Sequence, residues 1–258
     1  MIRFDFSGKR VLVTGASRGI GFAVAQGFAA AGAELAILAD DAGVIEAAGR
    51  LSASCGRPVA GHVCDITDRA AVARVVGGLG RLDVLVNNAG LELITPIRED
   101  GEGVERTFRR IVEVNVLGSY AVTREVVRTM QAGGRILFTA SVWGKTAVGE
   151  FSAYCASKHA VIGLMRSLAQ ELGPSGIAVN AICPGWVRTE ASLRSLGEMA
   201  RRARRAEADV LDGILAAQAV GGLMAPDDVV SIYLFLASDA AANIAGQSYN
   251  VDRGEFMS

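Results

Sequence analysis

Short runs of consecutive apolar residues alternate along this chain with longer stretches that are apolar at helical spacing. The apolar runs of strand length lie at residues 10–14, 34–39, 58–63, 82–86, 134–139, 176–182 and 247–251. The helical stretches lie at residues 22–31, 44–54, 68–79, 102–130, 151–172 and 227–237. Strands without polar alternation are buried on both faces, as in a parallel sheet covered by helices. The pattern predicts an α/β fold: one doubly wound, Rossmann-type parallel sheet in a single domain over residues 1–258.

One segment departs from this alternation. Residues 189–224 are helical in composition but longer than a connection between a strand and a helix needs to be. A long excursion after the carboxyl end of a strand is a candidate lid over a ligand. We therefore expect residues 189–224 to cover a substrate.

A glycine-rich turn, Thr14-Gly-Ala-Ser-Arg-Gly-Ile-Gly21, joins the first strand to the first helix. Gly15 permits a tight turn, Gly19 lets the backbone approach a pyrophosphate, and Gly21 allows the helix to pack closely on the sheet. The free N–H groups and the positive dipole end of the helix favour a phosphate there. This context predicts a dinucleotide site.

The end of the second strand bears on which dinucleotide binds. Asp40 and Asp41 stand there, and an acidic residue at this point accepts hydrogen bonds from the adenosine ribose and repels a 2′-phosphate. Arg18, in the glycine turn, could instead pair with a 2′-phosphate. Two negative charges oppose one positive charge, so we expect NAD rather than NADP.

Tyr154 and Lys158 are four residues apart in a predicted helix, which places a phenol and an ammonium on one face. An ammonium about 4 Å away would lower the pKa of a tyrosine from about 10 toward working pH. Such a group can act as a general acid and base. Taken alone, the pair is more simply a packed tyrosine and a solvated lysine.

Composition excludes several classes of function. The formal net charge of −1 implies no attraction to nucleic acid or to an anionic membrane. No apolar run has the length of a membrane span and no signal-peptide pattern is present, so we expect a cytoplasmic protein. The 4 cysteines show no Cys-x-x-Cys pair and there are only 2 histidines, so we expect no metal site.

At this point the chain resembles a known family, the classical short-chain dehydrogenases/reductases, from about residue 8 to residue 254. The resemblance rests on the glycine turn and on motifs that follow it in the family's order: Asp65-Ile66, Asn87-Asn-Ala-Gly90, Asn115, Ser141, Tyr154-x-x-x-Lys158, and Pro184-Gly185 with Thr189. Arg253 is a departure, because the family commonly has a second glycine before Gly254. Ala39 is another, at the position that often holds the NAD-selecting Asp.

The resemblance implies a mechanism. Tyr154 would be the general acid and base for an alcohol and carbonyl pair, and Ser141 would hydrogen-bond the substrate oxygen. Lys158 would lower the pKa of Tyr154 and hold the nicotinamide ribose. Asn115 would help to position a water that connects Lys158 with solvent. The expected cofactor contacts are Gly15, Ser17, Arg18, Gly19, Ile20, Gly21, Asp40, Asp65, Ile66, Asn88, Ala89, Gly90, Tyr154, Lys158, Pro184, Gly185, Val187 and Thr189.

The substrate is less defined. We expect Trp143, Phe151, Trp186 and Leu193 to line its pocket, with residues 91–93 nearby. The C-terminal Tyr249-Asn-Val-Asp252 with Met257-Ser258 resembles that of NAD-dependent polyol dehydrogenases. The alternatives are a 3-oxoacyl thioester reductase that uses NADPH, and a non-catalytic dinucleotide-binding sensor or structural protein. The family is commonly tetrameric, so the resemblance implies a homotetramer.

Overall fold

The strands form one parallel sheet. A computed structural model describes residues 4–99 and 101–257, so Ser258 of the tail motif lies outside the described residues. Within this range the sheet has 7 strands in the order β3-β2-β1-β4-β5-β6-β7. The bounds are β1 (Arg10–Thr14), β2 (Glu34–Ala39), β3 (Ala60–Val63), β4 (Val84–Asn87), β5 (Arg135–Thr139), β6 (Ala178–Pro184) and β7 (Ser248–Val251). Every neighbouring pair is parallel, which confirms the predicted sheet.

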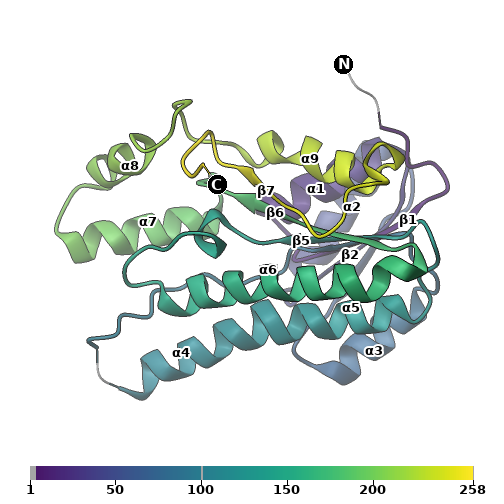
Figure 1. The fold of residues 1–258 in the computed structure, drawn as a ribbon, viewed down its shortest axis with the longest axis horizontal. Helices are drawn as coiled ribbons and strands as arrows, with labels where there is room; N and C mark the ends of the chain where they lie inside the picture. Colours follow the sequence, from purple (N-terminus) through teal and green to yellow (C-terminus); the bar gives the residue numbers. More distant parts are fainter. Residues whose placement is uncertain (1–3, 100, 258) are drawn as a thin grey trace.

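Helices cover both faces of the sheet (Figure 1). One layer holds α1 (Gly19–Ala30), α2 (Gly43–Cys55) and α9 (Val230–Ala237), and the other holds α3 (Arg69–Gly78), α4 (Glu102–Val112), α5 (Ser119–Val127) and α6 (Ser152–Leu172). Successive strand residues point to opposite faces. Val11 and Val13 therefore join one core, whereas Leu12, between them, joins the other. This two-sided burial explains the continuous apolar runs in the sequence.

The long helix expected over residues 102–130 is continuous from residue 102 to residue 127, but it is not α-helical throughout. The chain instead forms α4, a π-helical segment at Glu113–Gly118, and then α5. A π-helical turn inserts an extra residue, a change that apolar spacing does not reveal, and such turns are frequent at functional sites. Gly118 ends the segment against Ile66: a Cβ on Gly118 would lie 2.6 Å from the Ile66 Cγ1.

Residues 189–224 form the excursion that the sequence indicated. It contains α7 (Glu190–Ala203) and α8 (Glu207–Leu215), which project beyond one end of the sheet, at the left of Figure 1. A parallel bridge between Val187 and Met224 closes its base. Arg253, in the C-terminal turn, donates a hydrogen bond from Nη1 to the Gly221 carbonyl oxygen at 2.7 Å. Both ends of the segment are therefore fixed to the body of the protein.

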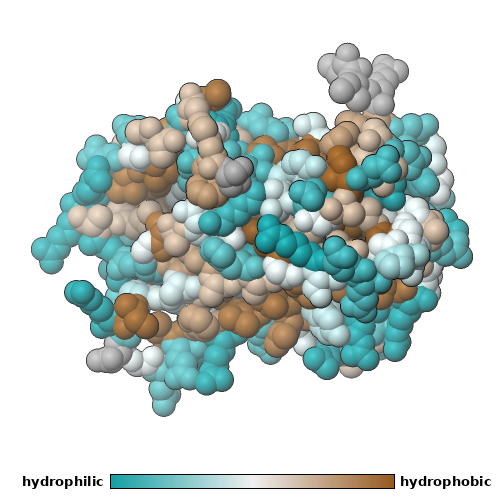
Figure 2. All heavy atoms as spheres, viewed as in Figure 1, coloured by the Kyte–Doolittle hydropathy of each residue, from teal (hydrophilic) through white to brown (hydrophobic). Residues whose placement is uncertain are grey.

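The helical layer with α4 and α6 presents apolar surface. Figure 2 shows brown, hydrophobic atoms gathered along the part of this view where Figure 1 places these helices. Phe108, Leu117 and Tyr120, which lie in α4, the π-helical segment and α5, are all exposed. Within the described residues, no helix is both long and apolar enough to cross a membrane.

We expect Gly118→Ala to lower the free energy of unfolding by about 1–3 kcal/mol, because the new methyl group overpacks against Ile66. Gly163→Ala in α6 is the matched control. A Cβ there meets nothing within 4 Å, so it should be neutral or stabilise by up to about 1 kcal/mol. Urea unfolding measures both. Equal effects of the two changes would contradict the close contact at Gly118.

Candidate active site

The carboxyl ends of β1, β4, β5 and β6 open into one cavity of about 500 Å³. It lies where strand order reverses between β1 and β4, the place at which open parallel sheets bind ligands. Each residue expected to contact a dinucleotide lines this cavity: Gly15, Ser17, Arg18, Gly19, Ile20, Gly21, Asp40, Asp65, Ile66, Asn88, Ala89, Gly90, Tyr154, Lys158, Pro184, Gly185, Val187 and Thr189.

The glycine turn forms one wall of the cavity. Gly15 has a positive φ of 64°, and a Cβ there would lie 2.6 Å from the Ala89 Cα. A Cβ on Gly21 would lie 2.2 Å from the Gly15 carbonyl oxygen, so neither position accepts a side chain. Arg18 precedes α1 and makes no side-chain capping bond to it. The first N–H groups of α1 thus have no side-chain cap, which fits a bound pyrophosphate.

Asn88 joins the ends of β1 and β4. Its Nδ2 donates to the carbonyl oxygens of Thr14 and Gly15, both at 3.1 Å. The Thr14 hydroxyl accepts hydrogen bonds from the N–H groups of Asn88 and Ala89, both at 3.0 Å. These four bonds hold the glycine turn in fixed register with the loop that leads to residues 91–93.

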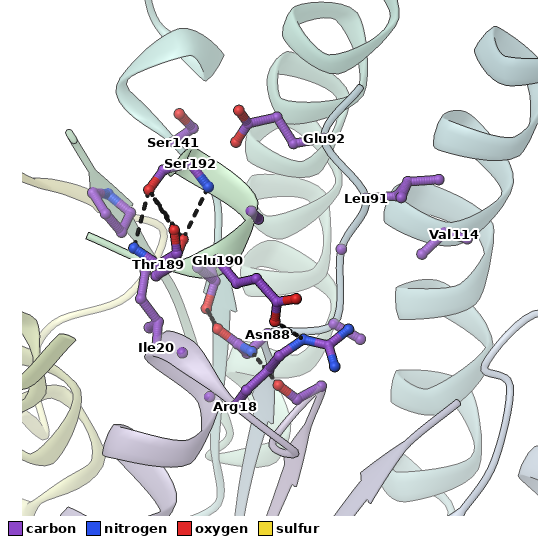
Figure 3. A pocket seen from close by; sticks show the side chains of 18 of the residues that line it. Arg18, Ile20, Asn88, Leu91, Glu92, Val114, Ser141, Thr189, Glu190 and Ser192 are labelled. Atoms are coloured by element: carbon purple, nitrogen blue, oxygen red, sulfur yellow. Dashed lines mark hydrogen bonds and ion pairs between the residues drawn. The ribbon is translucent and has the colours of Figure 1, made fainter. Parts of the chain in front are cut away.

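Two carboxylates lie near Arg18 at the far end of the cavity, and Figure 3 shows one of them, Glu190, beside it. Arg18 lies 3.2 Å from a Glu190 carboxylate oxygen and 3.8 Å from one of Asp41. Asp41 also accepts hydrogen bonds from the Ser17 hydroxyl at 2.8 Å and the Gly43 N–H at 2.9 Å. Asp40 lines the same region and is exposed. The charge of Arg18 is therefore balanced by carboxylates.

Asp65 is held by a residue that the sequence did not indicate. The Arg110 Nη2 donates to Asp65 at 2.7 Å, and the Thr67 N–H donates at 2.9 Å. Burial alone would raise the pKa of Asp65, but the hydrogen bonds from Thr67 and Arg110 lower it overall. Arg110 comes from α4 and also lines the cavity. No motif around residue 110 marks it in the sequence.

Ser141, Tyr154 and Lys158 meet at the other end of the cavity. Ser141 follows β5, and its hydroxyl accepts a hydrogen bond from the Trp143 N–H at 3.1 Å. The side chains of Ser141 and Tyr154 are hydrogen-bonded. The Lys158 Nζ lies 5.5 Å from the centre of the Tyr154 ring and donates to the Thr139 carbonyl oxygen at 2.7 Å. All three side chains are buried and all line the cavity.

The expected lowering of the Tyr154 pKa is wrong for the protein as described. Burial raises the pKa of Tyr154 and the negative charge of Glu92 raises it further, whereas the hydrogen bond with Ser141 lowers it. Burial also lowers the pKa of Lys158 to about 8, although the charge of Glu92 acts in the opposite direction. Removal from water disfavours the charged form of each group, and it is the largest cause of the pKa shift at both Tyr154 and Lys158.

Asn115 does not line the cavity, yet it supports its wall. Its Nδ2 donates to the Leu91 carbonyl oxygen at 3.0 Å and to the Ser157 hydroxyl at 2.9 Å. Its Oδ1 accepts from the Leu91 N–H at 2.7 Å. The side chain of Asn115 thereby fixes both backbone groups of Leu91. This arrangement couples the π-helical segment to the loop after β4.

Two of the four residues expected to line the substrate pocket line the cavity. Trp143 and Trp186 line the cavity, and their ring centres are 6.1 Å apart. Phe151 does not line it: this ring is 1% exposed and packs behind Trp143, with ring centres 5.1 Å apart. Leu193 does not line it either, because its position on α7 leaves it 45% exposed at the surface. Helical spacing alone could not tell which side of α7 faces inward.

Several lining residues were not predicted as site residues. Besides Asp41, which the sequence placed at the end of the second strand, they are Leu38, Ala39, Cys64, Leu91, Glu92, Arg110, Val114, Thr139, Ala140, Val142, Glu190, Ala191, Ser192 and Arg194. Of residues 91–93, which the sequence placed near the substrate, Leu91 and Glu92 line the cavity. The position of Glu92, just after the Asn-Asn-Ala-Gly turn, was the available signal.

Among residues 4–99 and 101–257, no group of three or more His, Cys, Asp or Glu side chains is arranged to hold a metal ion.

Comparison with known proteins places this site in context. A family model described as Enoyl-(Acyl carrier protein) reductase matches residues 15–255. A sorbitol dehydrogenase from Cereibacter sphaeroides is 34% identical over 264 residues, covering 97% of this chain and 98% of that protein. A 3-oxoacyl-(acyl-carrier-protein) reductase from Escherichia coli is 33% identical, covering 98% and 99%.

Solved structures agree with the sequence comparisons. The structure of L-sorbose reductase from Gluconobacter frateurii, complexed with NADPH and L-sorbose, superposes with a TM-score of 0.90 and 27% identity, covering all of both chains. This likeness extends over the sheet, both helical layers and the excursion. Together with the ordered motifs and the cavity that they line, it establishes that the chain belongs to the short-chain dehydrogenase/reductase family, as an oxidoreductase that acts on CH–OH groups with a nicotinamide dinucleotide.

Proposed function

We propose that the protein interconverts a secondary alcohol and a ketone in a polyol or similar small hydroxy compound, with NAD as its cofactor. One observation carries this proposal: Ser141, Tyr154 and Lys158 lie together at one end of a cavity whose other end is the glycine turn. Similarity to a sorbitol dehydrogenase and an L-sorbose reductase supports the substrate class.

The proposed mechanism assigns one task to each side chain. A nicotinamide dinucleotide held by the residues that line the cavity would supply the hydride acceptor for oxidation and the hydride donor for reduction. The Tyr154 oxygen takes the proton of the substrate hydroxyl during oxidation and gives it back during reduction. The Ser141 hydroxyl, already hydrogen-bonded to Tyr154, stabilises the negative charge that develops on the substrate oxygen. Lys158 holds the nicotinamide ribose and supplies positive charge near the phenol.

We expect cofactor binding to change the pKa of Tyr154 and so to affect proton transfer. Burial raises the pKa of Tyr154, so the phenol holds its proton firmly in the protein alone. A positive charge beside the phenol would lower that pKa, and the Lys158 ammonium and a bound oxidised nicotinamide would supply it. Asn115 serves the same step indirectly, because it fixes the loop beside Lys158 and, on the family pattern, helps to position a water there.

The preference for NAD rests on the charges at the adenosine end. Asp40 is exposed there and Asp41 is held by Ser17 and Gly43. Arg18, the cation that could accept a 2′-phosphate, is already close to two carboxylates. A 2′-phosphate would meet uncompensated negative charge, whereas a ribose hydroxyl would find an acceptor. The similar L-sorbose reductase was solved with NADPH, so the choice depends on this chain's own residues.

A second candidate function is the reduction of a 3-oxoacyl thioester with NADPH. The 33% identity to the Escherichia coli reductase over nearly the full length of both chains favours it. The two candidates differ in substrate and in cofactor. Assays with a polyol and NAD, and with a 3-oxoacyl thioester and NADPH, therefore separate them.

We further propose three properties around the site. Residues 189–224 act as a lid, because α7 contributes Glu190, Ser192 and Arg194 to the cavity wall. The exposed apolar side chains along α4 and α5 support a homotetramer of the kind common in the family. The free thiols of Cys55, Cys64, Cys155 and Cys183 support a cytoplasmic, reducing location.

We expect Tyr154→Phe to lower kcat for alcohol oxidation by about 10²–10⁴-fold, because it removes the proton acceptor. Cofactor affinity, measured by NADH fluorescence titration, should change by less than about threefold, since the ring stays in place. Tyr120→Phe is the control, because Tyr120 lies on α5 and does not line the cavity. If Tyr154→Phe turned over at the rate of the unmodified protein, Tyr154 would not be the proton acceptor.

We expect the unmodified protein to have a higher kcat/KM with NAD than with NADP. Asp40→Ala should shift the ratio of the two kcat/KM values toward NADP by roughly tenfold to a hundredfold, because one repulsive charge is lost. Glu171→Ala, an exposed charge change at the end of α6, should leave the ratio unaltered. If NADP already serves the unmodified protein as well as NAD does, the NAD proposal fails.

A further inference from the structure

Glu92 places a carboxyl group inside the catalytic cavity. It follows the Asn-Asn-Ala-Gly turn and lines the cavity together with Ser141 and Tyr154. Figure 3 shows its carboxylate pointing toward the Ser141 side chain. The residue before it, Leu91, has both backbone groups bound by Asn115, at 2.7 and 3.0 Å. The Glu92 side chain therefore starts from a rigid backbone.

The surroundings of this carboxyl group are unusual for a glutamate. Burial raises its pKa, whereas a hydrogen bond with the Ser195 side chain and the charges of Lys158 and Arg194 lower it. Among the described residues no salt bridge joins an arginine to Glu92; the Arg194 Nη2 instead donates a hydrogen bond to the Glu92 backbone oxygen at 3.5 Å. The ionisable groups that face it are thus Tyr154 and Lys158 from α6 and Arg194 from α7.

A half-buried carboxylate with a single side-chain hydrogen bond has acceptor capacity left over. An ionised carboxylate offers about four lone-pair sites and no donor. The group that satisfies it best is a neutral donor, such as a hydroxyl, supplied by whatever fills the cavity beside Ser141 and Tyr154. A second carboxylate in that place would be repelled, and a thioester carbonyl would bring only an acceptor.

We propose that Glu92 is a specificity-determining residue that accepts a hydrogen bond from a hydroxyl flanking the reacting carbon, so that the cavity selects neutral polyols over anionic hydroxy acids and unflanked alcohols. This inference rests on the proposed dehydrogenase function and deepens it. Trp143 and Trp186 complete the selection, because their rings pack against the carbon skeleton while Glu92 binds its oxygen.

A purely structural role makes different demands on the same residue. If Glu92 served only to hold α7 through Ser195, its loss would change kcat/KM by the same factor for every substrate. A charge near Tyr154 also changes the pKa of its neighbours, which a purely structural contact with Ser195 would not do. The Glu92 charge raises the pKa of both Tyr154 and Lys158, so its removal lowers both.

The test compares Glu92→Gln and Glu92→Leu with the unmodified protein. Sorbitol and xylitol serve as polyols, 2-hexanol as an unflanked alcohol and 3-hydroxybutyrate as an anionic hydroxy acid. The unmodified protein should prefer a polyol. Glu92→Leu should lower kcat/KM for the polyols by about tenfold to a hundredfold, mainly through KM, and alter that for 2-hexanol by less than threefold. Glu92→Gln should lower kcat/KM for the polyols by a smaller factor than Glu92→Leu does. Both variants should show a higher kcat/KM for 3-hydroxybutyrate than the unmodified protein.

The pH dependence provides the second readout. Alcohol oxidation requires the deprotonated Tyr154, so its rate rises with pH through the pKa of that group. In both variants the half-maximal pH for oxidation should fall by roughly half a unit or more. Glu99→Gln is the matched control: Glu99 lies on the same connection and pairs with Arg202 of α7 at 2.5 Å, but outside the cavity. It should alter neither substrate preference nor the pH profile.

The outcomes separate this inference from the proposed function. Oxidation of 2-hexanol or 3-hydroxybutyrate but not of polyols would keep the dehydrogenase and overturn the role of Glu92. An equal loss on polyols and 2-hexanol, with an unchanged pH profile, would also overturn it. If the unmodified protein oxidises none of the four alcohols with NAD or NADP, the proposed function itself fails.

Discussion

The buried ammonium of Lys158 is the interaction on which the active-site end of the structure depends. The side chain is 5% exposed, and its Nζ donates to the Thr139 carbonyl oxygen at 2.7 Å. Taking such a charge out of water costs several kcal/mol, and accordingly the pKa of Lys158 falls to about 8. The Thr139 hydroxyl is itself hydrogen-bonded to Tyr233 at 2.8 Å and to Asn88 at 3.2 Å. Solvating one cation thus requires β5, α6, α9 and the loop after β4 to be fixed together.

The parallel sheet makes that requirement achievable. Gly15, Asn88 and Ala140 come from distant parts of the chain, but each follows the carboxyl end of one of three adjacent strands. The pairing of Val13 with Val86, and of Val86 with Leu137, brings those ends to one edge. Strands buried on both faces cannot slip in register without exposing apolar side chains. The positions of the groups that line the cavity are therefore a consequence of core packing.

The same physics explains what could be predicted from sequence. Apolar runs placed β1 and β2 at the observed bounds, and the ordered motifs located the residues that line the cofactor half of the cavity. Predictions that needed the orientation of a side chain were less successful. Leu193 faces outward and Phe151 lies behind Trp143, because packing between elements decides both.

The predicted pKa of Tyr154 failed for a related reason. Spacing along a helix shows that Lys158 is near, but it shows neither how deeply both groups are buried nor that Glu92 arrives from another loop. Arg110 was missed because only the fold brings α4 to Asp65. Local patterns thus identify groups that meet in the cavity, whereas the ionisation of those groups depends on neighbours contributed by remote segments.

Carboxylate groups lie at both ends of the cavity. Asp40 and Asp41 stand at the adenosine end, and Glu92 stands beside Tyr154 at the substrate end. A carboxylate accepts hydrogen bonds from hydroxyl groups and repels phosphates and carboxylates, so the proposed preferences for NAD and for a neutral polyol rest on the same interaction. The charge at the substrate end also opposes deprotonation of Tyr154. On this proposal, the charge of Glu92 helps to select a hydroxyl-bearing substrate but makes Tyr154 harder to deprotonate. A substrate hydroxyl that donates to the Glu92 carboxylate would disperse the negative charge of that carboxylate and so weaken its effect on Tyr154.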